Sequence, residues 1–366
     1  MESHKITMFD SVKDPRIEGR CSHKLSSILF IATCTLISNG EDCIDMEEYG
    51  KANLAWLTNY IDLPNGIPTH DTFNRVLQKL SPKELGDILS NNGKDLIKQI
   101  AEKHIAIDGK RIKGVSPKSR GNRGLYILNA WISESNICIG QKRIEDKTNE
   151  ISEIPVLLES LDIQSSIVSI DAIGCQKGIC NQIITQGADY LLSVKGNQKS
   201  LHQEIQEIFK YSEVKQKDIE HQKDHGREES RECLVLDAAS HLSPDMQKKW
   251  PTVNKIIQIK GVRILDNKKT ESIRYYISSN TDKTAKQFNK LIRSHWSIEN
   301  HLHWHLDVTF NEDDCRMRTG HAPENMNILR KLALTKIRNQ QDKKSLKKRR
   351  YRASLDNNYL AQLLLN

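Results

Sequence analysis

Three acidic residues in this 366-residue chain have the sequence surroundings of metal ligands. Asp171 ends an uncharged, largely β-branched run (167–170), and Asp108 ends a similar run (104–107). Glu299 lies in a later helical stretch rich in tryptophan and histidine. Two carboxylates at strand ends and one on a helix can hold two divalent ions. The three residues therefore predict metal-dependent phosphoryl transfer on nucleic acid.

Each of these acids also has a structural interpretation. Asp108 is placed to open a turn after a strand, and Asp171 to cap a helix that begins near Gln176. Glu299 shares a helical face with the histidines four residues away, as a solvated stripe would. Asp307 competes with Glu299 as the third ligand. Because the run before Asp171 carries no other charge, an ionised group there needs a partner or a metal, which favours the functional interpretation.

Basic residues follow two of the predicted strands. Lys110 and Arg111 lie just beyond Asp108, where they could meet phosphate groups. Lys195 follows a later strand and either binds DNA phosphate or only ends that strand at a turn. The chain as a whole has 55 Lys and Arg against 47 Asp and Glu, a net charge of +8, which favours a polyanionic partner.

The histidines after Glu299 suggest a second kind of metal site. His301, His303 and His305 alternate, but residues two apart on a helix diverge by roughly 200°. Only His301 and His305 would therefore share a face, and structural zinc is the alternative use of this segment. The eight cysteines include no CxxC pair, so they indicate neither a zinc site nor a disulfide framework.

Several other classes lack their local signatures. The sequence has no GxxxxGK[ST] loop, no GxGxxG after a strand and no GxSxG elbow. No run of about 18 apolar residues is present, so no membrane partner is expected. The N-terminus lacks the residue order of a secretory signal, which predicts a cytoplasmic location.

The first part of the chain is predicted to be a separate helical domain (1–100). Apolar residues recur at three- and four-residue spacing between residues 25 and 36 and again between residues 73 and 80. Ser81 and Pro82 form a helix start, with a capping hydroxyl followed by proline in the first turn. This domain is a candidate for DNA end recognition, although such modules as often serve dimerisation or packing.

From residue 101 to about 340 the pattern changes to an α/β domain. Three adjacent strands suggest an antiparallel meander, and strands then alternate with helices, the order of a ribonuclease H-like fold. The predicted strands are residues 104–107, 125–132, 137–144, 167–170 and 190–194, and the predicted helices are residues 154–161 and 176–186.

A β-rich insertion (200–285) interrupts that predicted core, and a basic tail follows it. We expect a polar loop at residues 221–231 within the insertion, between a helix and three β-rich runs. Helical periodicity resumes at Phe288 and continues to about Leu306. The C-terminal segment (341–366) holds seven basic residues between Asp342 and Arg352, a block that is usually a solvated tail but is suited to phosphate contact.

Five motifs in this order resemble those of the bacterial insertion-sequence transposases of the DDE class, in the branch that includes the H-repeat-associated proteins. They are Ile-Asp-Gly-Lys (107–110), Lys-Thr-Asn-Glu-Ile (147–151), Ile-Asp-Ala-Ile-Gly-Cys-Gln (170–176), Asp-Tyr-Leu-Leu-Ser-Val-Lys-Gly-Asn-Gln (189–198) and His-Trp-Ser-Ile-Glu-Asn-His-Leu-His-Trp-His-Leu-Asp-Val (295–308). The resemblance covers residues 10 to 340.

The resemblance implies a ribonuclease H-like catalytic domain with Asp108, Asp171 and Glu299 as catalytic and metal-binding triad. It implies Mg²⁺, with Mn²⁺ as a substitute, and cleavage and transfer of double-stranded DNA at the terminal inverted repeats of a mobile element by a homodimer. Related hairpin-forming transposases carry Tyr, Arg and Lys around the glutamate, and here those positions are Ile292, His295 and Leu306.

This departure leaves the hairpin step open and gives neighbouring residues other roles. His295 would bind phosphate, and Trp296 or Trp304 would stack on an unpaired base. A domesticated or inactive relative that binds DNA without cutting is the alternative function, and a nuclease without a transfer step is a third.

Overall fold

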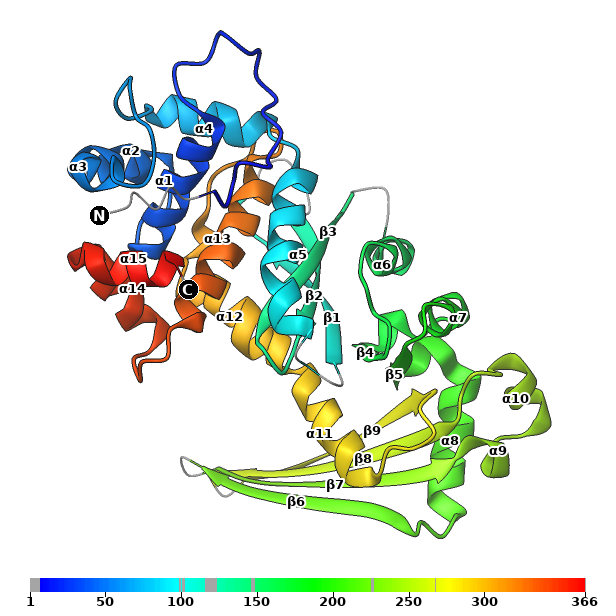
Figure 1. The fold of residues 1–366 in the computed structure, drawn as a ribbon. Helices are drawn as coiled ribbons and strands as arrows, with labels where there is room; N and C mark the ends of the chain where they lie inside the picture. Colours follow the sequence, from blue (N-terminus) through cyan, green and yellow to red (C-terminus); the bar gives the residue numbers. More distant parts are fainter. Residues whose placement is uncertain are drawn as a thin grey trace.

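The computed structural model describes residues 7–98, 100, 103–115, 124–145, 149–224, 227–266 and 268–365, with the backbone alone for residues 92–98 and 224. Lys147 and Thr148 of the second motif lie outside the described residues. Figure 1 shows a helical end, a central sheet flanked by helices, and a long β-ribbon at the opposite end.

One sheet runs through the described structure, in the order β3-β2-β1-β4-β5-β9-β8-β7-β6. Its first five strands in the chain are β1 (Lys103–Ile112), β2 (Leu125–Ile132), β3 (Ile137–Ile144), β4 (Ser166–Ile170) and β5 (Asp189–Val194). Strands β1, β2 and β3 are antiparallel, whereas β4 pairs parallel with β1 and with β5. An antiparallel meander extended by two parallel strands is the ribonuclease H-like arrangement, so the predicted fold class is confirmed.

The insertion extends this sheet beyond β5 instead of forming a sheet of its own. Its strands are β6 (Gln216–Asp224), β7 (Arg227–Asp237), β8 (Lys255–Leu265) and β9 (Lys268–Ser278). The polar loop predicted at residues 221–231 is wrong for the described part of that segment, because residues 221–224 belong to β6 and residues 227–231 to β7, and the two strands pair. Residues at the outer end of the ribbon are largely exposed to solvent, so they are charged or polar. They therefore lack the alternation of apolar and polar residues by which a strand is recognised in a sequence.

Helices cover both faces of the sheet. On one face, residues from β1, β4 and β5 share a core with α6 (Glu150–Glu159), α7 (Lys177–Thr185) and α8 (Lys199–Tyr211). On the other face lie α5 (Pro82–Lys98), α11 (Ala285–His295), α12 (Trp304–Val308) and α13 (Ala322–Asn339). The short helices α9 (Ala238–His241) and α10 (Pro244–Lys249) lie at the end of the insertion near α8 (Figure 1).

The N-terminal helices share their core with the end of the chain. They are α1 (Leu25–Ile37), α2 (Cys43–Ala52), α3 (Leu54–Leu57) and α4 (His70–Lys79), and they pack with α13, α14 (Leu346–Leu355) and α15 (Asn357–Leu365) in one hydrophobic cluster. Helix α1 is apolar on every side, and Ser26 is its one residue that is not buried. Such a helix needs neighbours all round, which α13 helps to supply.

The C-terminal basic segment differs from the expected solvated tail. Arg350 is 1% exposed, and its Nε donates to the carbonyl oxygen of Leu36 at the end of α1 (3.0 Å). Its guanidinium also lies over the Phe310 ring, 4.3 Å from the centroid. Arg349 is buried as well and pairs with Asp342 at 2.7 Å. These arginines satisfy carbonyl and carboxylate groups within the fold, a use that basic composition does not reveal.

No helix in the described part of the chain combines the length and the apolar character that crossing a bilayer requires.

Candidate active site

The parallel pairing of β1 with β4 brings the two aspartates to the same edge of the sheet. Ile107 is in register with Ile170, so Asp108 and Asp171 follow at adjacent positions. Along β1, side chains alternate between the two faces, with Ile107 in the core under α6 and α7. Asp108 consequently points toward the face that α11 covers.

Glu299 lies on an irregular part of a long helical segment. Between α11 and α12, residues Ile298–His303 form a π-helical turn, a wider turn often found at functional sites. Ile298 and Leu302 on this turn are fully buried in the helical core. Glu299 remains exposed and faces the ends of β1 and β4.

A cavity of 320 Å³ joins these elements. Six of the nine residues predicted to act at the site line it, namely Asp108, Asp171, Glu299, Lys195, His295 and Trp296. Asp108 and Asp171 are 63 residues apart in the chain, and Glu299 follows Asp171 by 128 residues, so the tertiary structure alone makes these three acids neighbours. Lys110, Arg111 and Trp304 do not line this cavity.

The acids in the cavity repel one another. Burial raises the pKa of Asp108 to about 7, and the negative charges of Glu299 and Asp171 add to this rise against a hydrogen bond from the backbone of Gly109. Partial burial also raises the pKa of Glu299. Within the described residues, no lysine or arginine forms an ion pair with any of the three acids. The cavity therefore holds more negative charge than the fold neutralises.

Carboxylate oxygens are the hard donors that Mg²⁺ and Mn²⁺ prefer, so the donor set fits a divalent cation. Uncompensated acids at one cavity are stabilised when such an ion neutralises them. Among the described residues, no three His, Cys, Asp or Glu side chains are yet grouped closely enough to hold a metal ion. Binding an ion would therefore require these carboxylates to draw together.

Asp171 also acts as a cap, which was the alternative to metal binding, but it caps a short 3₁₀ turn and not the helix predicted near Gln176. Its Oδ1 accepts a hydrogen bond from the backbone N–H of Ile173 (3.1 Å), which caps the short 3₁₀ turn Ala172–Gly174. Helix α7, which begins at Lys177, has no side-chain cap. The cap fixes one oxygen of Asp171 and leaves the other for the cavity.

A series of buried polar contacts connects Lys331, Asn129 and His303 with Asp108. Lys331 on α13 has only donor hydrogens, and its ammonium contacts Asn129 Oδ1 on β2. The Asn129 amide nitrogen then faces His303 Nε2 at 3.2 Å and donates to it. The remaining His303 nitrogen, Nδ1, lies 3.6 Å from Asp108 Oδ2. Lys331 therefore fixes the orientation of Asn129, and Asn129 fixes the hydrogen of His303 on Nδ1.

Both histidines next to the acids are neutral at ordinary pH. Burial lowers the pKa of His303 to about 3, and the charges of Lys110 and Lys331 add to this effect. Burial alone lowers the pKa of His295 to about 4, and its Nδ1 shares a hydrogen bond with Ser169 Oγ (2.8 Å). His295 would therefore meet a phosphate group as a neutral imidazole, and its phosphate-binding role stays a prediction.

The structure corrects the predicted role of Lys110, which was contact with DNA phosphate. Its side chain is 6% exposed, and its ammonium pairs with Asp307 Oδ1 (2.5 Å) and Glu312 Oε2 (3.0 Å). Burial tends to lower the pKa of Lys110, but the charges of Glu312 and Asp307 outweigh it and raise that pKa. Lys110 therefore neutralises an internal acid cluster and is not available to DNA. Asp307 belongs to that cluster and does not line the cavity.

The other predicted contacts lie outside the cavity. Arg111 is exposed on the opposite face of β1 from Asp108. Trp304 is 51% exposed and lies edge-on to His305. His301 bonds Asn136 and His305 bonds Thr309, so these two histidines do not converge as a zinc site would require.

A fourth acid near the site was not singled out from the sequence. Glu150 begins α6, and burial and the charge of Asp171 raise its pKa against a hydrogen bond from Tyr126. The Tyr126 ring lies so close to Gly109 that a Cβ there would be 2.4 Å from its hydroxyl. The signal for Glu150 was its place in the second motif (147–151), which carried no chemistry of its own.

The sheet order and the acid-lined cavity define a member of the ribonuclease H-like class. The family described as "Transposase DDE domain" matches residues 100–336, and the one described as "DDE_Tnp_1-associated" matches residues 6–91. The chain therefore belongs to the bacterial DDE transposase family.

Its relatives match along their whole length. The "H repeat-associated putative transposase YhhI" of Escherichia coli K12 is 38% identical, over 100% of this chain and 98% of the relative. The "Putative transposase YncI" of E. coli O157:H7 is 37% identical, over 96% and 92%. A solved piggyBac transposase synaptic complex with hairpin DNA aligns at a TM-score of 0.45 and 11% identity, over 97% of this chain and 80% of that one.

Proposed function

We propose that this chain is a DNA transposase that cuts and joins DNA strands at the inverted ends of an insertion sequence. The observation that carries the proposal is the cavity that Asp108, Asp171 and Glu299 line together, with no ion pair to a lysine or arginine among the described residues. Membership of the DDE transposase family supports the same reaction class.

Asp108, Asp171 and Glu299 would hold Mg²⁺, or Mn²⁺ in its place. When bound, such ions supply Lewis-acid stabilisation of the phosphate and lower the pKa of a coordinated water. The protein contributes position: β1 and β4 fix the two aspartates, and the π-helical turn presents the glutamate. Lys195 is exposed at the same cavity, where its ammonium would bind the phosphate backbone.

The partner in this proposal is double-stranded DNA with terminal inverted repeats, bound by a homodimer in the cytoplasm. Arg111 and Trp304 lie on exposed surfaces away from the cavity, where they would contact DNA outside the cleavage point. The helices α1 to α4 remain the candidate for recognising the DNA ends.

The test is Mg²⁺-dependent cleavage of a DNA fragment that carries the element's ends, compared with the same fragment lacking them. Wild-type protein should nick the first fragment and give joined products, and Asp171→Asn should do neither. Equal activity of the two proteins would overturn the assignment. Cleavage without joining would indicate a nuclease, and binding without cleavage a DNA-binding relative.

A further inference from the structure

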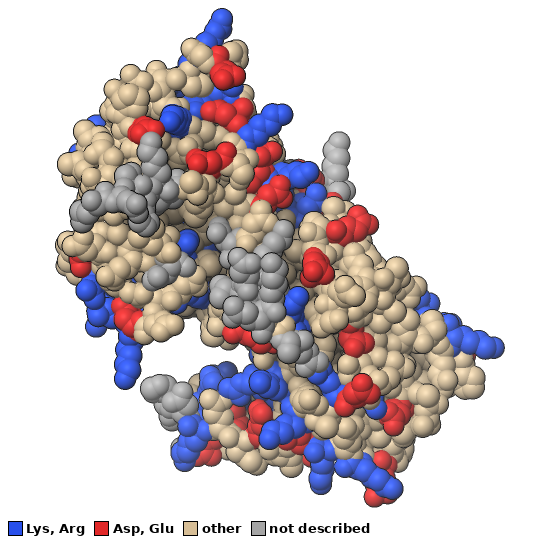
Figure 2. All heavy atoms as spheres, viewed as in Figure 1, with Lys and Arg blue, Asp and Glu red and all other residues tan. Residues whose placement is uncertain are grey.

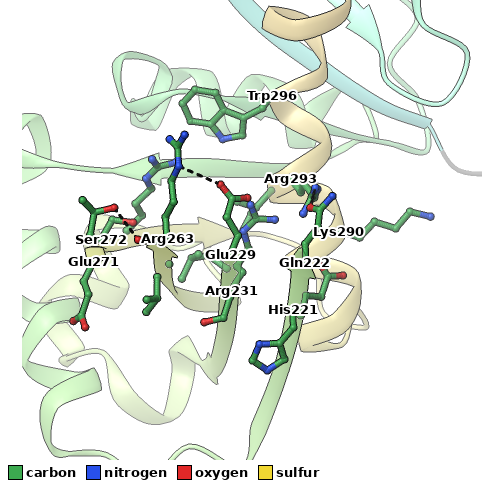
Figure 3. Close-up of a pocket in the computed structure, with 18 of the residues that line it drawn as sticks. His221, Gln222, Glu229, Arg231, Arg263, Glu271, Ser272, Lys290, Arg293 and Trp296 are labelled. Atoms are coloured by element: carbon green, nitrogen blue, oxygen red, sulfur yellow. Dashed lines mark hydrogen bonds and ion pairs between the residues drawn. The ribbon is translucent and has the colours of Figure 1, made fainter. Parts of the chain in front are cut away.

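A second hollow adjoins the acid-lined cavity. It has a volume of 800 Å³ and lies between α11 and the strands β6 to β9 of the insertion (Figure 3). Four residues line both spaces: Arg274, Tyr276, Ile292 and Trp296. We call this second space the insertion groove. Because the linings overlap, a chain molecule held at the acids can continue directly into the groove.

The lining of the groove is predominantly basic. Its cations are Arg231, Arg263, Arg274, Lys290 and Arg293, and its acids are Glu220, Glu229 and Glu271. Glu271 pairs with Lys269 (2.5 Å), which lies outside the groove lining. Glu229 pairs both with Arg227 outside the lining (3.2 Å) and, more distantly, with Arg263 inside it (3.9 Å). Figure 2 shows Lys and Arg side chains gathered on the insertion beside the hollow of the molecule.

Two guanidinium groups of the groove, those of Arg231 and Arg293, lie close enough for their charges to interact. Burial lowers the pKa of Arg231, and the positive charge of Arg293 lowers it further, against the negative charges of Glu220 and Glu229. The buried Nη1 of Arg231 has no hydrogen-bond partner in the described structure. A buried, unsatisfied donor beside a like charge is stabilised by an anion, and a phosphate matches the geometry of guanidinium donors.

An aromatic ring stands where the groove meets the cavity. Trp296 is 40% exposed, and the Arg274 guanidinium lies 5.1 Å from its ring centroid. Figure 3 shows Trp296 projecting from the helix above the Arg263 side chain. Phosphate-binding cations along a groove and an aromatic ring at its mouth are the two components of single-strand binding sites.

We propose that the insertion groove holds one unpaired DNA strand that leads away from the acids, with a phosphate between Arg231 and Arg293 and a base on Trp296. This inference rests on the proposed function, because the strand would be that of the DNA being cut. The volume of the groove is that of a site for a drug-sized molecule and far below that of a duplex segment. A base can stack on Trp296 only when it has left its partner in the duplex.

The charge part of the proposal is tested by binding of a short fluorescein-labelled single-stranded oligonucleotide, measured by anisotropy over a series of salt concentrations. The double variant Arg231→Gln/Arg293→Gln should weaken binding about tenfold at low salt. Loss of two phosphate contacts should also reduce the slope of log K against log salt by about 1.4. The matched control Lys248→Gln/Lys249→Gln removes two exposed charges on α10 and should leave the slope unchanged.

The stacking part is tested by Trp296→Ala and Trp296→Phe in the same assay. The alanine variant should bind roughly tenfold more weakly, and the phenylalanine variant should retain most of the affinity because it keeps an aromatic face. The ring is exposed on one side, so both variants are expected to fold, which thermal unfolding checks.

The outcomes separate this inference from the proposed function. If wild-type protein cuts end-bearing DNA and the groove variants bind the oligonucleotide as tightly as wild type, the groove inference is wrong and the transposase proposal stands. If the groove variants lose affinity for intact duplex and not for single strands, the groove binds duplex and the inference is also wrong. If wild type neither binds nor cuts DNA, both fail.

Discussion

Two groups of acids lie on the same face of the sheet, and they differ in whether lysine or arginine side chains pair with them. Asp307, Glu312 and Asp313 surround the Lys110 ammonium, and Arg330 and Lys113 complete the ion pairs. The cavity acids have no such cation among the described residues, and their mutual repulsion adds to the burial that raises the pKa of Asp108. We call these groups the paired cluster and the open cluster.

The contrast begins with two residues on one strand. Asp108 and Lys110 are two positions apart on β1, so they point to the same face. The lysine turns into the paired cluster, and the aspartate faces the cavity. A cluster that carries its own cations is complete as a structural element, whereas an acid cluster without them is suited to a cation from outside.

Removing a charge from the open cluster should abolish activity and spare the fold. Asp171→Asn keeps an oxygen that can accept the Ile173 N–H, so thermal unfolding should change little. Loss of one ligand should lower Mg²⁺-dependent cleavage by about a thousandfold or more. The control is Asp162→Asn, because Asp162 is an exposed aspartate whose side chain also accepts a hydrogen bond from a backbone N–H two residues later. This variant should keep wild-type activity. If Asp162→Asn lost as much cleavage activity as Asp171→Asn, the loss would not be due to the open cluster.

Removing a charge from the paired cluster should instead lower the stability of the fold. Glu312 is fully buried and contacts Lys110 and Arg330. Glu312→Gln leaves these buried cations undercompensated and should destabilise the protein by about 3 kcal/mol in urea unfolding. Asp314→Asn, at an exposed neighbour, should change stability little. If Glu312→Gln unfolds like wild type, the paired cluster is not a stability element and the comparison fails.

His303 contacts the open cluster through Asp108, and the position of its hydrogen gives a further test. Asparagine at position 303 places an amide near the Nδ1 site that faces Asp108, whereas glutamine reaches toward the Nε2 site that faces Asn129. We therefore expect His303→Gln to weaken Mn²⁺ binding by about tenfold and His303→Asn to weaken it less. Mn²⁺ titration followed by electron paramagnetic resonance measures both. The opposite order would show that His303 does not orient Asp108.

The last test is a pH dependence of stability in the presence of a chelator. The pKa of Asp108 is about 7 in the folded protein against an ordinary value of 3.8, so the folded state binds more protons between these pH values. The stability that this difference provides is lost as pH rises from about 4 to 7, by at most about 1.4 kcal/mol per pH unit. Asp108→Asn lacks this component, so the stability difference between variant and wild type should grow with pH. A constant difference would contradict the raised pKa of Asp108, which comes first from burial and then from the charges of Glu299 and Asp171.

Some features of this protein could be predicted from local sequence. The β-branched runs before Asp108 and Asp171 predicted strands of the ribonuclease H-like sheet, and the helical periodicity from Phe288 onward predicted the helical segment that carries Glu299, because burial of one face imposes a fixed spacing. The pairing of residues 221–224 with residues 227–231 could not be predicted in this way. Its outer end is exposed, so its pairing comes from the neighbouring strands of the ribbon and not from an apolar pattern.

The sequence by itself determined the type of chemistry that we propose, because carboxylates that end apolar strands cost free energy to bury without a partner or an ion. Only the tertiary structure decided which charges remain without one. Lys110 follows Asp108 closely and was expected to bind DNA, yet Asp307 and Glu312, about two hundred residues later, hold it inside the fold. Arg350 is withdrawn from the surface in the same way by the end of α1. Coulombic pairing depends on distance in space, and chain composition does not contain that distance.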